Sequence, residues 1–321
     1  MSDRIRLGRL FSGLLVAGIV VLLAANIASN WEELRKYAAE GNLRFSPTDL
    51  ALSGACFVLG FAALVQGWRL VVRALGAEIG YPGAFRVVVQ SSMGRYIPGK
   101  IWAAAGLVYL GRRRGVPVAA GAAGAVISTV LVVMAGLICS LPRFLPLVPA
   151  PWNVLLPAAA FFLAAALLHP RVLAAAVDRL SRAAGRGGCG VSYRYGALGS
   201  AVPFYLIFWI GLGAGFVFSL RGIGLSPAPA ASASAYAFAY AGGVLAFPAP
   251  GGVGVREGLL ALGLKGLVSP ALAAAVGVYA RLWSTVLEAL LFGCSFLVGR
   301  RSGVGIDCAA ENMPASHNHD G

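Results

Sequence analysis

The chain has 321 residues, of which 59% are hydrophobic and only 12% are charged, and its formal net charge is +14. Soluble domains carry about a quarter charged residues, so this composition excludes a water-soluble globular enzyme and indicates an integral membrane protein. The positive charge does not indicate nucleic-acid binding, because Lys and Arg lie mainly in short loops between apolar runs, as the positive-inside rule describes.

Apolar runs along the chain predict six membrane-spanning helices, because a helix needs about 20 apolar residues to cross a bilayer. The predicted spans cover about 10–29, 48–70, 116–140, 152–169, 196–220 and 270–299. Arg4, Arg6 and Arg9 place the N-terminus in the cytoplasm, and we expect the first run to be a retained span rather than a cleaved signal.

The segment 87–111 is predicted to enter and leave the membrane on one side. Arginines on both flanks belong on the cytoplasmic side, and the segment is too short for two spans. At its centre lies Ile97-Pro98-Gly99-Lys100. Proline removes a backbone donor and glycine loosens the helix. This pattern predicts a re-entrant helical hairpin.

A second break lies in the segment 231–267, where the sequence from Phe247 to Gly252 interrupts an apolar stretch with two prolines and two glycines. The charge pattern predicts a second re-entrant hairpin, entering from the opposite face. Alternating alanines at 231–241 have the period of a strand, but a lone strand leaves its backbone unsatisfied in lipid, so we expect a helix.

These elements predict an all-α polytopic membrane protein, with about six transmembrane helices plus two re-entrant helical hairpins in an inverted repeat. Paired interrupted segments of this kind occur in secondary transporters. One domain would span residues 1–300, with repeat 1 at about 48–140 and repeat 2 at about 196–299. Residues 301–321 are expected to form a disordered cytoplasmic tail, and the basic loop 171–194 is expected to contain an amphipathic surface helix.

The candidate site is formed by the two breaks, because a helix that starts inside a membrane presents unpaired N–H groups and a positive dipole end to anions. Ionisable residues at membrane depth are also functional candidates. The substrate-binding candidates are Arg95, Pro98, Gly99, Lys100, Pro250, Gly251, Gly252, Arg256, Glu257, Arg281 and Glu288.

Two interpretations of these charges remain open. In the first, Arg95, Lys100 and Arg256 bind a lipid phosphate, and Glu257 pairs with Lys100 or Arg95 or recognises a cationic head group. In the second, the basic residues follow the positive-inside rule and the ion pairs are structural. The pair Ser128-Thr129 is interpreted as a helix–helix contact.

Catalytic and metal-binding patterns are missing from the sequence. It contains no Ser-His-Asp set, no paired catalytic carboxylates and no Cys or His at metal-ligand spacing. We therefore expect no enzyme activity and no cofactor.

Two motifs resemble the signature segments of the lysylphosphatidylglycerol synthase transmembrane, or flippase-like, family. They run from Arg95 to Trp102 and from Pro248 to Gly258, and the resemblance covers roughly residues 10–300. It implies translocation of aminoacylated or other anionic lipids between leaflets, without the soluble synthase domain. Many relatives carry an acidic residue after the first Pro-Gly, whereas this chain has Ile101 and Trp102, which leaves Glu257 as the acid near the breaks.

The resulting expectation is a translocator of an anionic or aminoacylated phospholipid, or a related polar lipid, in the cell (inner) membrane with both termini cytoplasmic. The alternative is a non-transporting membrane subunit that scaffolds a lipid- or glycan-modifying enzyme. A homo-oligomer is compatible with either function.

Overall fold

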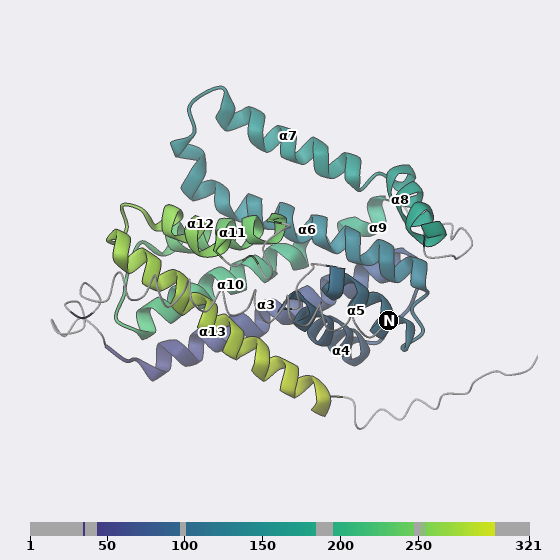
Figure 1. Cartoon of the computed structure of the whole chain (residues 1–321), viewed down its shortest axis with the longest axis horizontal. Helices are drawn as coiled ribbons and strands as arrows, with labels where there is room; N and C mark the ends of the chain where they lie inside the picture. Colours follow the sequence, from purple (N-terminus) through teal and green to yellow (C-terminus); the bar gives the residue numbers. More distant parts are fainter. Residues whose placement is uncertain are drawn as a thin grey trace, which may run out of the picture.

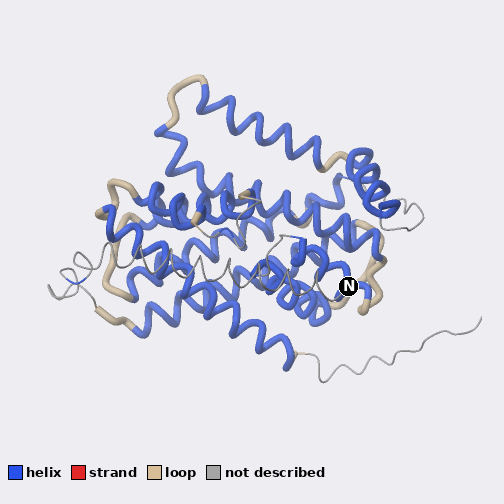
Figure 2. The backbone as a smooth tube through the Cα atoms, viewed as in Figure 1, coloured by secondary structure: helices blue, strands red, loops and turns tan. Residues whose placement is uncertain are grey.

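The computed structural model describes residues 44–96, 101–183, 195–246 and 254–298, together with the single residues 35 and 252. Within these ranges the chain forms helices and turns, with no strand drawn (Figure 2). The predicted all-α class is therefore confirmed. The segment predicted as the first span, 10–29, lies outside the described residues.

Four helices are long and apolar enough to cross a membrane. They are α3 (Pro47–Ala74), α6 (Val118–Phe144), α10 (Val202–Gly222), which is preceded by the short α9 (Tyr195–Gly199), and α13 (Pro270–Leu297). They coincide with the spans predicted at 48–70, 116–140, 196–220 and 270–299. The protein is thus a multi-pass membrane protein by the length and composition of its helices.

Helix α7 (Trp152–Leu167) occupies the segment predicted as a fourth span, but it has only 16 residues. At 1.5 Å per residue it is about 24 Å long, shorter than a hydrocarbon core of about 30 Å. It lies along the outer edge of the bundle (Figure 1), and Ala164 is its one buried residue. Helix α8 (Pro170–Ala183) follows at the segment predicted to form a surface helix.

Shorter helices occupy the two segments, 87–111 and 231–267, that the sequence predicts to be hairpins. The first interrupted segment consists of α4 (Tyr81–Ser92), the 3-10 turn η1 (Met93–Tyr96) and α5 (Ile101–Arg112). The second consists of α11 (Pro229–Leu245) and α12 (Val255–Leu264). Residues 97–100 and 247–251, which contain the predicted breaks, lie outside the described residues. The alanine-rich stretch in α11 is helical, as predicted.

Local sequence explains where several of these helices begin. Ser46 and Ser269 are the N-caps of α3 and α13, and each accepts a backbone hydrogen bond from the residue three positions later, followed by proline at the first helical position. Gly254 is the N-cap of α12, and its φ of +79° favours glycine. The Glu257 side chain accepts a hydrogen bond from the Gly254 N–H at 2.7 Å, which holds this carboxylate at the start of α12.

Helices α3 and α10 pack closely because small residues face each other. An ideal Cβ on Gly211 would lie 2.8 Å from the Cys56 carbonyl oxygen, and one on Gly60 would lie 3.0 Å from the Phe208 carbonyl oxygen. Only glycine permits backbones to approach this closely. The interface is also joined by Ser53, whose hydroxyl donates to the Gly215 carbonyl oxygen at 2.6 Å.

The remaining contacts occur in matching pairs between the two halves. Helix α4 packs on α13, and α11 packs on α6. Helix α5 packs on α6, and α12 packs on α13. Exchanging α3, α4, α5 and α6 for α10, α11, α12 and α13 therefore reproduces the same set of contacts. The first helix of each interrupted segment lies against the last long helix of the opposite half, and the second lies against the last long helix of its own half.

Candidate functional site

A cavity of about 440 Å³ lies among both interrupted segments and all four long helices. This volume is within the range of small-molecule sites. Its lining includes four charged residues, namely Arg95, Arg256, Arg281 and Glu288. Apolar side chains cover most of the remaining surface, among them Leu64, Trp68, Val88, Leu107, Val132 and Phe208. The cavity therefore combines an ionic part with an apolar part.

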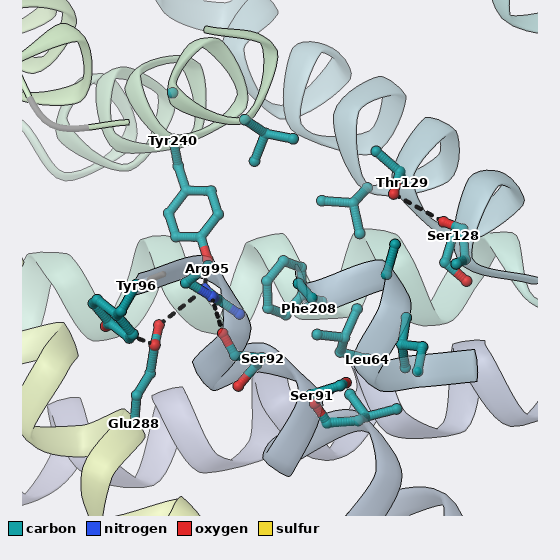
Figure 3. A pocket seen from close by; sticks show the side chains of 18 of the residues that line it. Leu64, Ser91, Ser92, Arg95, Tyr96, Ser128, Thr129, Phe208, Tyr240 and Glu288 are labelled. Carbon is teal, nitrogen blue, oxygen red and sulfur yellow. Dashed lines mark hydrogen bonds and ion pairs between the residues drawn. The ribbon is translucent and has the colours of Figure 1, made fainter. Parts of the chain in front are cut away.

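The first ion pair of the cavity joins η1 to α13. Arg95 Nη1 lies 3.1 Å from Glu288 Oε1, and the Glu288 side chain is only 3% exposed. The other carboxylate oxygen of Glu288 accepts a hydrogen bond of 2.9 Å from the Tyr96 hydroxyl. Arg95 also donates to the Tyr240 hydroxyl and, at 2.9 Å, to the Ser92 carbonyl oxygen (Figure 3). Both charges are thus paired and hydrogen-bonded, as burial requires.

The second ion pair joins α12 to α13 with the opposite polarity. Arg281 Nη1 lies 2.8 Å from Glu257 Oε1, and the two side chains are 15% and 12% exposed. The other oxygen of Glu257, Oε2, accepts the Gly254 N–H and so caps α12. The two oxygens of this carboxylate therefore join the start of α12 to α13. Arg281 lines the cavity, whereas Glu257 is not a lining residue and contacts the cavity wall through Arg281.

Arg256 is held by tyrosines instead of a carboxylate. Its Nη2 donates to the Tyr236 hydroxyl at 2.6 Å. Its guanidinium carbon lies 5.0 Å from the centre of the Tyr236 ring and 4.4 Å from that of Tyr240, which is the geometry of cation–π attraction. Neither ion pair in the described part of the chain includes Arg256. The ionic cluster, formed by Arg95, Arg256, Arg281, Glu257 and Glu288, therefore carries one uncompensated positive charge.

The structure brings together every candidate residue that it describes. Arg95, Arg256, Arg281 and Glu288 line one cavity, and Glu257 reaches it through Arg281. Gly252 is buried against α11, where an ideal Cβ would lie 2.9 Å from the Gly243 carbonyl oxygen. Pro98, Gly99, Lys100, Pro250 and Gly251 lie outside the described residues.

The pairing within the cluster differs from the sequence-based expectation. Arg95 meets Glu288 and Glu257 meets Arg281, so the predicted contact between Glu257 and Arg95 is wrong. The reason is that Arg95 and Glu257 both pack against α13. The two charged residues of α13, Arg281 and Glu288, are seven positions apart and so lie on one face, about two turns from each other.

Sequence reasoning missed the two tyrosines that hold the arginines. Tyr236 and Tyr240 are four residues apart in α11 and therefore share a face, but an aromatic pair in an apolar helix is ordinarily part of a core. Sequence reasoning also treated Ser128 and Thr129 only as packing residues. The structure places both on the cavity lining, although Ser128 also accepts a hydrogen bond from Tyr205 across the α6–α10 interface.

Comparison with known families identifies this architecture. A family model described as the lysylphosphatidylglycerol synthase TM region matches residues 10–291. The chain belongs to this family. No curated protein matches the sequence. The match includes both interrupted segments and all of the ionic cluster. The cavity of this lysylphosphatidylglycerol synthase TM family member therefore lies within the matched membrane region.

Proposed function

We propose that the protein is a lipid translocator, which moves an anionic or aminoacylated phospholipid or a related polar lipid between leaflets without altering it chemically. The observation that carries the proposal is the meeting of charged residues from both interrupted segments on α13, within one cavity. Ionisable groups at membrane depth are costly and commonly mark the path of a polar substrate.

The proposal includes an inverted repeat with two re-entrant hairpins, and the packing of the helices supports it. The contacts of α3–α6 are reproduced by those of α10–α13, as expected for two copies of one folding unit. Helices α4 and α5 have 12 residues each, so each is about 18 Å long and too short to cross the bilayer alone. In transporters built from inverted repeats, substrate sites lie where such interrupted helices meet near the midplane.

The charge of the cavity favours an anionic group on the lipid. Three arginines and two glutamates leave one positive charge, and Arg256 is the arginine without a carboxylate. Arginine binds phosphate oxygens in a planar, bidentate geometry. The apolar part of the cavity would accept the glycerol and the upper acyl chains while the rest of the lipid stays in the bilayer.

The distribution of basic residues favours the inner cell membrane with cytoplasmic termini. Arg69, Arg73 and the arginines at 112–114 flank the first interrupted segment, whereas Arg143 and Arg221 are isolated basic residues at the opposite ends of α6 and α10. By the positive-inside rule the former side is cytoplasmic.

Lipid translocation in proteoliposomes tests the proposal. Fluorescent phosphatidylglycerol and an aminoacylated analogue would be placed in both leaflets and exposed to a quencher that acts only from outside. Wild-type protein is expected to allow quenching of more than the half that one leaflet contains. Arg256→Gln is expected to slow the excess roughly 10- to 100-fold, the effect of losing a hydrogen bond from a charged group.

Arg221→Gln is the matched control, because this exposed arginine lies at the end of α10 and outside the cavity. It should retain the wild-type rate. Quenching of only half of every lipid by the wild-type protein would contradict translocation. It would favour the scaffold function, for which a stable membrane-enzyme partner should co-purify in detergent.

A further inference from the structure

The carboxylates of the ionic cluster are already engaged by groups of the protein. Glu288 lines the cavity, but its side chain is only 3% exposed. Its Oε1 lies 3.1 Å from Arg95 Nη1, and its Oε2 accepts the Tyr96 hydroxyl at 2.9 Å (Figure 3). Glu257 is paired with Arg281 and does not line the cavity. A ligand therefore meets no unpaired carboxylate oxygen in the described part of the cavity.

Between residues 50 and 300 the sequence offers no other acid to this site. The acids in this range other than Glu257 and Glu288 are Glu78 and Asp178. Glu78 is exposed between α3 and α4, Asp178 belongs to α8, and neither lines the cavity. The two predicted breaks contain no Asp or Glu. An ammonium group in the cavity would therefore find no carboxylate of its own from this part of the chain.

Arg256, by contrast, can still bind an anion. It lines the cavity, and its one hydrogen bond within the described residues is the 2.6 Å donation to the Tyr236 hydroxyl. Its other N–H groups are available to phosphate oxygens, which arginine binds in a planar, bidentate geometry. The rings of Tyr236 and Tyr240 could attract a cation, but Arg256 already occupies both. The cluster thus offers donors to an anion and no free acceptor to an ammonium.

We propose that the cavity selects a phospholipid with one net negative charge and no ammonium group, such as phosphatidylglycerol, and excludes its aminoacylated derivatives. The inference rests on the proposed function, since it takes the ligand to be a translocated lipid, and it decides between the two lipid classes named there. A phosphodiester would neutralise the charge that Arg256 leaves uncompensated. The ammonium of an aminoacyl group would be desolvated beside arginines without a counter-ion, which is costly.

The test compares three lipids with the same acyl chains, namely phosphatidylglycerol, alanyl-phosphatidylglycerol and N-acetyl-alanyl-phosphatidylglycerol. The acetylated lipid keeps the bulk of the alanyl lipid and lacks its charge. Pairs of lipids at equal concentration would compete for the purified protein in detergent, and native mass spectrometry would measure the bound ratio. The buffer would be held near pH 6, so that the amine, with a pKa of about 7.7–8, is protonated.

Wild-type protein is expected to bind phosphatidylglycerol and the acetylated lipid about equally. It should bind the alanyl lipid roughly tenfold more weakly, as expected when a desolvated charged group is left unpaired. The acetylated lipid separates charge from size, because a cavity that is merely too small would reject both alanyl lipids.

Arg95→Gln tests whether the engagement of Glu288 causes the exclusion. It removes the charge partner of a carboxylate that lines the cavity, so the alanyl lipid gains a counter-ion and most of its tenfold penalty should disappear. Arg281→Gln is the matched control, because it removes the same charge from the cavity wall but frees Glu257, which is not a lining residue. This variant should keep most of the penalty. Should Arg95→Gln fail to fold, the wild-type comparison with the acetylated lipid decides the proposal by itself.

Equal binding of phosphatidylglycerol and the alanyl lipid by wild-type protein would overturn the selection by charge. Weak binding of the acetylated lipid would also overturn it, and an equal loss of the penalty in both variants would overturn the part assigned to Glu288. If phosphatidylglycerol and the alanyl lipid bind equally and are both translocated in proteoliposomes, the proposed function stands and only the selection is wrong. If no lipid binds and none is translocated, both proposals fail.

Discussion

The two interrupted segments present opposite charges to the same helix. The first contributes Arg95, which pairs with Glu288, and the second contributes Glu257, which pairs with Arg281. Both pairs fix a short helix against α13. The second segment also carries Arg256, which has tyrosines around it and no carboxylate. Within the described residues, the comparison separates charges that fix the interrupted segments against α13 from Arg256, which neither ion pair includes.

The largest effect is expected from Glu288→Ala, because it removes a carboxylate that is only 3% exposed and leaves Arg95, which is 27% exposed, without its charge partner. Removing one partner of a buried ion pair typically costs about 3–5 kcal/mol. Thermal unfolding in detergent would measure the loss. The double variant Arg95→Ala/Glu288→Ala should recover part of the stability, and additive losses would show that the pair does not hold the first segment.

A smaller loss of stability is expected from Glu257→Gln. The amide oxygen of Gln still accepts the Gly254 N–H, so the cap of α12 is kept, but Arg281 loses its charge partner. Because both side chains are partly exposed, we expect a cost of about 1–3 kcal/mol. Limited proteolysis near α12 would report local loosening, and an unchanged unfolding temperature would contradict a structural role for this pair.

Arg256→Lys tests whether translocation requires the planar guanidinium of Arg256 or only its positive charge. Lysine keeps the positive charge but loses the planar fork and its stacking on two tyrosines. We expect about a tenfold slower translocation, which corresponds to about 1.4 kcal/mol. Stability should also fall by about 1 kcal/mol, because the hydrogen bond to Tyr236 is weakened. A wild-type rate would mean that any cation suffices there.

The smallest effect is expected from Tyr236→Phe, which removes one hydroxyl from Arg256 and keeps the aromatic ring. The lost hydrogen bond should reduce stability by about 1 kcal/mol. Arg256 then depends on the ring faces alone, so translocation should fall less than in Arg256→Lys. A larger loss than in that variant would make the tyrosine itself part of the lipid site.

Several properties followed from the sequence because they depend on local patterns. Apolar stretches predicted α3, α6, α10 and α13, because about 20 predominantly apolar residues are enough for a helix to cross a bilayer. Proline and glycine predicted breaks at 97–100 and 247–252, which lie almost entirely outside the described residues, so these breaks stay predictions. The charged residues of both segments and of α13 were recognised as candidates because ionised groups are rare at membrane depth.

The tertiary structure alone decided the partners of these charges. Sequence spacing places Arg281 and Glu288 on one face of α13, but only the packing of α4 on α13 and of α12 on α13 assigns Glu288 to Arg95 and Arg281 to Glu257. Pairing across a helix bundle depends on contacts between residues far apart in the chain, and such contacts leave no periodic pattern in the sequence.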